Sequence, residues 1–250
     1  MTNPALVDAP AIETMLAHRS IRRFTADPVP DADIRRAVEA GQMTSTSSNV
    51  QAYSAIRVTD DTIRAELADL AGPQQKVVDC GAFFVICGDV RRHRLLTERA
   101  GEAYDAKLEA FLVAVIDASL FAQNACIAFE AMGYGICYIG GLRNNLARVG
   151  ELLRLPVGVY PFFGLCVGVP AEEPMPRPRV DVDAVLFENG YPEDETVLES
   201  IADYDAVYER YMEERSGRAM KWSEMMASKY MKAARLDVGP YYRAQGANLE

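Results

Sequence analysis

The sequence predicts one large domain in which helices alternate with a few short strands, as in the α/β or α+β class. The chain has 250 residues and half of them are hydrophobic, so it can bury a large core without a second domain. Segments with helical periodicity are separated by short apolar, β-branched runs that are typical of buried strands. We find no internal repeat or low-complexity block in the sequence.

The first part of the chain predicts two helices. Residues 11–17 have the first helical pattern, and Pro30 and Asp31 mark the start of the second because they are typical first-turn residues. The apolar positions of this second helix are Ile34, Ala37 and Val38. The Ser/Thr-rich stretch that follows, at 44–48, is too polar for a core, and we interpret it as a functional loop.

The central part predicts the sheet and one long helix. Residues 55–59 and 83–87 are apolar and β-branched, so we expect both to be central strands. Residues 108–132 are apolar on most sides, which predicts a fully buried helix at a subunit interface. Gly133 ends this helix because glycine adopts left-handed dihedral angles readily. The remaining core elements are a strand at 135–140, a helix at 146–153 and a strand at 160–169.

The C-terminal part differs in composition from the rest. From residue 172 the sequence becomes rich in proline and charge, and then polar with Tyr and Met, so its helices would have little core of their own. We therefore expect them to cover another surface. The predicted organisation is a single domain over 1–250, with a core at about 11–170 and a C-terminal extension at about 171–250.

Composition excludes several classes of function. A net charge of −10 and a pI near 4.9 argue against nucleic acid or an anionic membrane as partner. With two histidines and five singly placed cysteines, we expect no metal site and interpret the thiols as buried apolar groups in a reducing cytoplasm. We identify no signal peptide and expect no apolar stretch of spanning length, which predicts a cytoplasmic protein.

The run at 18–24, HRSIRRF, carries groups that suit an anion and an electron-rich ring. On an extended segment His18, Ser20 and Arg22 share a face, where an imidazole, a hydroxyl and a guanidinium can bind phosphate and carbonyl oxygens. Taken alone, such a run is more often a solvated basic stretch.

Three further segments change this interpretation. They are TSTSSNVQ at 44–51, GYGICYIGGLRNN at 133–145 and PRPR at 176–179. In this order and at these separations, the four segments resemble the nitroreductase superfamily, most closely its oxygen-insensitive NADPH nitroreductase and NADPH-flavin oxidoreductase group. The resemblance implies an α+β fold with a central mixed β-sheet flanked by helices. It also implies bound FMN, and a homodimer in which the C-terminal extension embraces the partner and both chains contribute to each flavin site.

The resemblance also implies how FMN is held. His18, Arg19 and Ser20 share the phosphate with Arg177 and Arg179, and Arg22 lies beside the ring, where its charge stabilises the reduced flavin. Hydroxyls of the ribityl chain face Thr46, Ser47 and Ser48. Gln74 reaches the pyrimidine side, while flavin N5 and the dimethylbenzene side face the backbone of Tyr138, Ile139, Gly140 and Gly141. By itself, the glycine pair is equally compatible with a β-turn.

NADPH requires no separate nucleotide-binding fold in this group. Gly133-Tyr134-Gly135 begins like a dinucleotide fingerprint, but position 138 is Tyr and the run follows a helix, so we reject a Rossmann site. The resemblance implies that the nicotinamide stacks on the flavin in the pocket that later takes the oxidant, which gives a ping-pong mechanism.

The resemblance places a further set of side chains at NADPH and substrate. Arg215 and Arg218 match an arginine-bearing loop that binds the 2′-phosphate, although they are closer together than in the group, and ordinary surface charge explains them equally well. Lys232 and Arg235 match positions in the substrate pocket, with Arg143 nearby. Asn49 replaces an aromatic residue found in other members, which leaves the pocket's shape open.

The implied reaction passes a hydride from NADPH through flavin N5 to a nitroaromatic, quinone or flavin acceptor, so we assign no general base or nucleophile. Two alternatives remain: an oxygen-reactive, flavin-processing relative, and a protein that binds or stores flavin.

Overall fold

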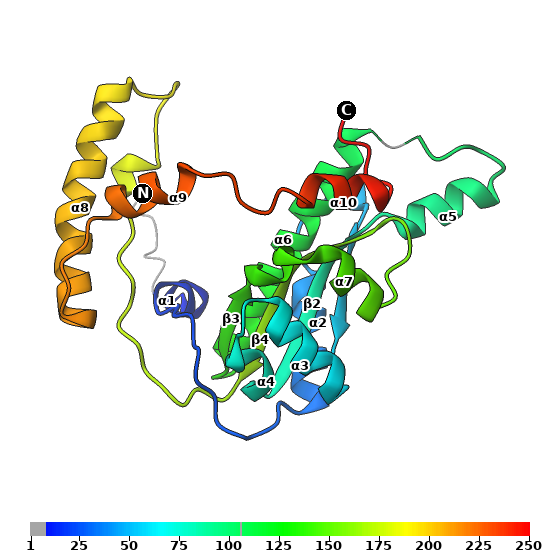
Figure 1. Ribbon diagram of the computed structural model, residues 1–250, viewed down its shortest axis with the longest axis horizontal. Helices are drawn as coiled ribbons and strands as arrows, with labels where there is room; N and C mark the ends of the chain where they lie inside the picture. The colour runs from blue at the N-terminus through cyan, green and yellow to red at the C-terminus, as the bar shows by residue number, and fades with distance from the viewer. Residues whose placement is uncertain (1–8, 106) are drawn as a thin grey trace, which may run out of the picture. The chain divides into compact units, whose positions relative to one another are not determined.

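The computed structural model describes residues 9–105 and 107–250 and divides into two compact units (Figure 1). The first unit comprises Met1–Pro174 with Arg235–Glu250, and the second comprises Met175–Ala234. The first contains the sheet and most of the helices, whereas the second contains two helices and a short 3₁₀ turn.

The sheet of the first unit has four strands in the order β1-β2-β4-β3. Their bounds are Tyr53–Arg57, Ala82–Asp89, Gly135–Ile139 and Val159–Gly168 for β1, β2, β3 and β4. All three pairings are antiparallel, and among the described residues parallel pairing is confined to the bridge between Ser20 and Ile136. The sheet is thus antiparallel where we expected a mixed one. Strand β1 also corrects the prediction that residues 55–59 and 83–87 are both central strands, because β1 lies at an edge and the central strands are β2 and β4.

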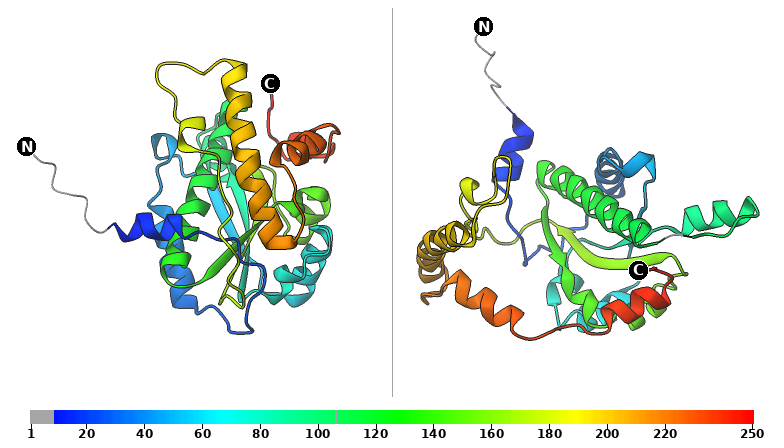
Figure 2. Two further views of the ribbon diagram at one scale, coloured as in Figure 1. Left: turned by 90° about the vertical axis from the view of Figure 1, so that its left-hand side faces the viewer. Right: turned by 90° about the horizontal axis from the view of Figure 1, so that it is seen from above.

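Alternating side chains of the strands divide the core between the two faces of the sheet. Phe84 and Ile86 of β2 pack under α2 (Asp31–Gln42) and α6 (Leu108–Ala131). Phe83 and Val85 face the opposite way, toward α3, α4 and α7. The bounds of these three helices are Asp61–Leu70, Gln75–Asp79 and Leu146–Leu152. Helices therefore cover both faces, and Figure 2 shows α6 running along one of them.

Helix α6 is buried on one face only, which corrects the expectation of full burial. Its inner side carries Ala118, Phe121 and Phe129, which are at most 2% exposed. On its outer side, four apolar residues spaced by fours are 37–55% exposed. They form the outer stripe of α6: Leu108, Leu112, Ile116 and Leu120.

Helix α6 also corrects the expectation that the chain has no apolar stretch of spanning length. Of the helices in the described residues, it alone is long and apolar enough to cross a membrane by length and composition, with a mean hydropathy of 1.7 over its most apolar window. Core helices of soluble proteins pass the same test, and the packing of α6 on the sheet is of that kind.

The remaining helices of the first unit lie around this core. Helix α1 (Pro10–Leu16) precedes the 18–24 run, and α10 (Val238–Ala244) packs its Tyr242 against Phe111 and Phe162. Helix α5 (Arg91–Arg99) extends away from the sheet (Figure 1) and has no buried residue.

The second unit has a small core of its own. Tyr204, Tyr208 and Tyr211 of α8 (Asp194–Ser216) are buried, and Trp222 at the start of α9 (Trp222–Tyr230) packs edge-on against Tyr204. Asp205 joins the two helices by accepting hydrogen bonds from the amide and the hydroxyl of Ser223. Gly217, with φ +67°, ends α8 in the left-handed conformation.

Candidate functional site

The run at 18–22 is fixed against the edge strand β3. Ser20 forms a parallel bridge with Ile136, and the amide of Ile21 donates to the carbonyl of Ile136 at 2.9 Å. Ile21 is buried, and a Cβ on Gly135 would come within 2.6 Å of it. The backbone of the run therefore sits directly on the strand that leads into the Tyr138–Gly141 segment.

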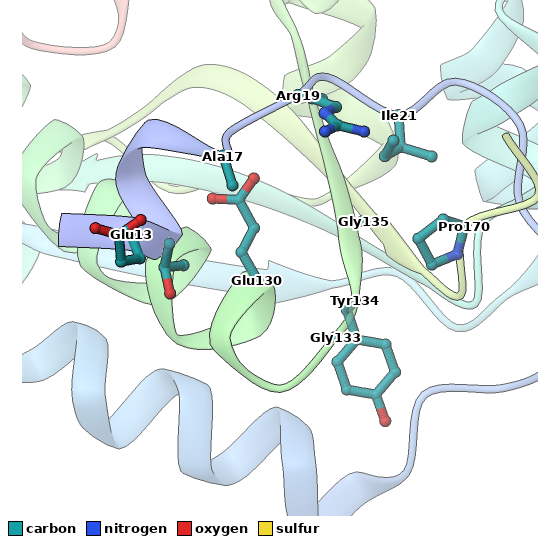
Figure 3. A pocket seen from close by; sticks show the side chains of 10 residues that line it. Glu13, Ala17, Arg19, Ile21, Glu130, Gly133, Tyr134, Gly135 and Pro170 are labelled. Carbon is teal, nitrogen blue, oxygen red and sulfur yellow. The ribbon is translucent and has the colours of Figure 1, made fainter. Parts of the chain in front are cut away.

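Two side chains of the run contact acidic residues. Nδ1 of His18 lies 2.7 Å from Oε1 of Glu130, and Arg19 donates from Nη1 to Glu173 at 2.8 Å. The second carboxylate oxygen of Glu130 and Nε of Arg19 are buried without a hydrogen-bond partner among the described residues. Figure 3 shows both side chains at one cavity of about 410 Å³, which Glu13 borders from α1.

Arg22 is exposed, and its position is set by the backbone. Its guanidinium donates to the carbonyl of Ser20 at 3.2 Å, and the amides of Arg22 and Arg23 donate to Glu172. Burial opposes the charge of Glu172, but these amides and the Arg23 guanidinium outweigh it and hold the pKa of the carboxyl below its usual value. Glu172 thus remains an acceptor that fixes the turn beside Arg22.

Strand β3 and the turn after it bring together the second group of predicted ligands. Gly140 and Gly141 begin a 3₁₀ turn (Gly140–Asn144), and a Cβ on Gly141 would lie 2.7 Å from Nε2 of Gln74 and collide with the carbonyl of Ala71. Only glycine allows this approach. Ile139 is 1% exposed, so its side chain belongs to the core and only its backbone is available to a ligand.

Tyr138 points toward α6. Its ring packs edge-on against Phe163 with centroids 5.2 Å apart, and its hydroxyl lies 3.3 Å from Sγ of Cys126 and 3.4 Å from Oε1 of Gln123. Burial is the main cause that raises the pKa of the Tyr138 hydroxyl, so it stays protonated. Tyr138 is 36% exposed as a residue, next to the glycine turn.

The loop containing Thr46, Ser47 and Ser48 is held by a residue that the sequence analysis missed. Asp117 of α6 is 1% exposed and accepts from the amide of Ala52 at 3.0 Å and from that of Ser47 at 3.4 Å. The sequence could have indicated Asp117, because it is the sole charged residue between Glu109 and Glu130. Ser48, Asn49 and Gln51 adopt left-handed φ values of 47°, 58° and 54°, which are strained for non-glycine residues.

Arg143 and Arg235, both predicted at the substrate, lie at one cavity of about 240 Å³ with Asn144 and Tyr241. Arg143 donates to the carbonyl of Phe162 at 2.7 Å, and Arg235 donates from Nε to Asn144 at 3.0 Å. Burial, and then the charge of Arg143, lower the pKa of Arg235. The two adjacent guanidiniums make this cavity attractive to an anion.

The other predicted cations belong to the second unit, which is described by itself. Arg179 donates to the carbonyl of Arg177 at 2.8 Å, and Tyr204 of α8 donates to the carbonyl of Pro178 between them at 2.8 Å. In the last turn of α8, the guanidinium of Arg215 lies 5.9 Å from the ring centroid of Tyr211. Arg218 and Lys232 are exposed.

The residues of the 18–20 run fit the phosphate of FMN. Arg19 carries a buried donor that lacks a partner among the described residues, next to an imidazole and a hydroxyl on the same run. Guanidinium, imidazole and hydroxyl groups are donors that suit a phosphate. In the part of the chain that the structure describes, no cluster of His, Cys, Asp and Glu is suited to a metal ion.

Comparison with known proteins decides the family. The sequence profile of the Nitroreductase family matches residues 15–169, and that of the Nitroreductase family, C-terminal domain, matches residues 177–250. The chain belongs to the nitroreductase family. The resemblance found in the four segments is thereby confirmed.

Individual relatives agree over nearly the whole length. The "FMN reductase (NADPH)" of Bacillus subtilis is 42% identical, covering 95% of this chain and 98% of that protein. The "Oxygen-insensitive NADPH nitroreductase" of Salmonella typhimurium is 39% identical, with 95% and 98% covered. The solved structure of "NADPH:FMN oxidoreductase from Vibrio harveyi complexed with NAD+" is 37% identical, has a TM-score of 0.88, and matches 97% of this chain and 100% of that one. The predicted nitroreductase fold is therefore confirmed.

Proposed function

We propose that this nitroreductase is an FMN-dependent enzyme that takes a hydride from NADPH and delivers it to nitroaromatic, quinone or flavin acceptors by a ping-pong mechanism. The observation that carries the proposal is the junction of the 18–22 run with β3 and the Gly140–Gly141 turn, which lies against Gln74. The names of the relatives, which combine NADPH with FMN, flavin or nitro reduction, support the same activity.

When bound, FMN supplies the hydride chemistry at N5, and the protein supplies binding and orientation. His18, Arg19 and Ser20 hold the phosphate, with Arg177 and Arg179 as further donors. Arg22 places a positive charge beside the ring. The remaining contacts come from Thr46, Ser47 and Ser48 at the ribityl chain, Gln74 at the pyrimidine side, and the backbone of Tyr138, Ile139, Gly140 and Gly141 along the ring.

NADPH and the oxidant use one pocket in turn. Arg215 and Arg218 bind the 2′-phosphate, because two guanidiniums near the end of α8 suit a dianion. Arg143 and Arg235 already lie at one cavity, and with Asn49 and Lys232 they position the acceptor. No side chain is required as a base or nucleophile, because the flavin carries the hydride.

The enzyme acts as a cytoplasmic homodimer. The outer stripe of α6 presents four exposed leucine and isoleucine side chains in a row, which is typical of a surface that a partner covers. Within one chain, hydrogen bonds tie the Ser47 loop to α6 through Asp117, on a different part of the fold from the His18 run. A site that the Ser47 loop of the partner completes accounts for the exposed stripe of α6 and for the separate positions of this loop and the His18 run within one chain. The five free, buried cysteines suit a reducing compartment.

Absorbance of the purified protein tests the proposal. We expect a yellow protein that bleaches under anaerobic conditions on addition of NADPH, and more slowly with NADH, and that regains its colour with a nitroaromatic or a quinone. A colourless protein that takes up no added FMN contradicts the flavin assignment. A yellow protein that NADPH does not bleach is instead a flavin-storing relative, and rapid recolouring by oxygen alone indicates an oxygen-reactive one.

A further inference from the structure

His18 is paired with a partly buried carboxylate from the far end of the long helix. Glu130 lies in the last turn of α6, and its Oε1 is 2.7 Å from Nδ1 of His18, 112 residues away in the sequence. The side chain of Glu130 is 12% exposed and that of His18 is 28% exposed. Figure 3 shows Glu130 pointing from the helix toward the segment between Ala17 and Arg19.

This geometry assigns the two ring nitrogens of His18 different tasks. A carboxylate accepts, so the proton on the side of Glu130 is held on Nδ1. Nε2 is then the ring nitrogen that is left for a ligand. A neighbouring carboxylate also orients the ring, as it does for histidines that bind metals.

The surroundings of Glu130 favour a positively charged partner. Its second oxygen is buried without a hydrogen-bond partner in the described residues, and a buried carboxylate is costly unless a cation lies beside it. Arg19 borders the same cavity, but its Nη1 binds Glu173. His18 is the group in direct contact with Glu130, and in its charged form it offers Nε2–H as a donor.

We propose that Glu130 is a positioning residue that holds His18 with Nδ1 toward the carboxylate and with Nε2 free to donate to the phosphate of FMN. This rests on the proposed function, because it takes His18 as a phosphate ligand. The carboxylate contacts the ring at Nδ1, which leaves Nε2 on the opposite side of the ring for the phosphate. A carboxylate that merely attaches α6 to the run would leave FMN binding independent of the charge on Glu130.

The chain suits a direct measurement, because it has two histidines. Protein labelled with ¹⁵N at histidine gives two imidazoles, and His93, whose Nε2 lies 2.9 Å from the carbonyl of Val50, is the internal reference. In the complex with FMN we expect both ring nitrogens of His18 to carry a proton, and we expect its Nε2 signal to move when FMN is added to apoprotein. The His93 signals should stay in place.

Glu130→Gln keeps the shape of the side chain and removes its charge. We expect the Kd for FMN, from quenching of flavin fluorescence, to rise about tenfold, while kcat at saturating FMN changes little. Glu13→Gln is the matched control, since Glu13 borders the same cavity from α1 but lies outside hydrogen-bond contact with His18. It should leave the Kd unchanged. In a His18→Gln background, Glu130→Gln should have no further effect.

Three results overturn the proposal: a Kd for FMN that Glu130→Gln does not change, an equal loss in the His18→Gln background, or a His18 Nε2 signal that ignores FMN. The last applies to the wild-type protein and so does not depend on a variant that folds. Wild-type protein that binds no FMN at all is a different result, because it contradicts the proposed function itself.

Discussion

The two units of the molecule hold their predicted ligands in different ways. In the first unit, the predicted flavin ligands are set by local contacts: the run at 18–22 lies on β3, Gly141 packs against Gln74, and Asp117 holds the Ser47 loop. In the second, Arg215 and Arg218 are exposed near the end of a helix whose core is three tyrosines. We therefore expect the buried contacts of the first unit to contribute most of the affinity for FMN, with Arg177 and Arg179 of the second unit as further donors, and Arg215 and Arg218 to determine which nucleotide is preferred.

The largest effect should come from filling the close approach in the first unit. A Cβ at Gly141 collides with the carbonyl of Ala71, and backbone there must shift, so Gly141→Ala should weaken FMN binding about 100-fold, or about 2.7 kcal/mol. Flavin titration measures the loss. Gly190→Ala in the second unit meets nothing within 4 Å and should leave the Kd for FMN unchanged. Equal Kd values for both variants would remove the distinction between the units.

A smaller effect, confined to one nucleotide, should follow from changes in the second unit. Replacing Arg215 and Arg218 together with Ala should raise the KM for NADPH at least about tenfold at low salt, because charge-assisted hydrogen bonds to the 2′-phosphate are lost. The KM for NADH and the Kd for FMN should hardly change, and high salt should partly mimic the variant. Arg210→Ala, also exposed on α8, is the control. Equal losses with both nucleotides would mean that the 2′-phosphate is bound elsewhere, with Lys232 and Arg235 the next candidates.

A substitution at Arg22 tests whether a cation in the first unit affects the midpoint potential of the flavin as well as the affinity of the protein for FMN. Arg22→Ala should retain FMN but lower its midpoint potential by about 30 mV, which corresponds to about 1.4 kcal/mol for a two-electron couple. Arg23→Ala is the matched control, because its guanidinium is bound to Glu172. Spectroelectrochemical titration gives the potentials, and an unchanged value for Arg22→Ala would show that Arg22 is not beside the ring.

The smallest effect concerns the packing of the second unit and its dependence on pH. Burial opposes the charge of Asp205, but hydrogen bonds from Ser223 outweigh it and hold the pKa of the carboxyl below its usual value. A lowered pKa contributes stability that is present above the unfolded pKa of about 3.9 and is lost as the pH falls through the folded value.

The emission of Trp222, the single tryptophan, should therefore change in acid as α9 leaves α8. The accompanying loss in the free energy of unfolding should be less than about 1 kcal/mol. Asp205→Asn should remove this part of the pH dependence and Asp203→Asn, exposed on the same helix, should retain it. A wild-type emission that is constant down to pH 2 would contradict the role of Asp205.

Local sequence patterns predicted most of the elements but not their neighbours in space. The helices at 31–42 and 108–131 and the strand at 159–168 lie within a few residues of their predicted bounds, because apolar periodicity and glycine placement report them directly. The edge position of β1 was missed, since strand order depends on pairing between distant segments. The outer stripe of α6 was missed for a related reason: apolar residues on all sides do not show which side the chain itself covers.

The same limit applies to the candidate site. The four segments indicated the flavin ligands by resemblance, whereas Asp117 and Glu130 went unnoticed although each is a lone acid in apolar sequence. Their partners are the amide of Ser47 and the ring of His18, 70 and 112 residues away. Contacts over such separations follow from the fold alone. The roles of individual ligands stay predictions.

All five cysteines are buried and free, which makes this enzyme a convenient subject for site-specific labelling. Thiol reagents react with accessible thiolates, so the folded wild-type protein should take up almost no maleimide. A cysteine placed at Gly190, where added atoms meet nothing, would be the single reactive thiol. One dye there, with the bound flavin as acceptor, would test whether the second unit moves during a catalytic cycle, without removing any native residue from the core.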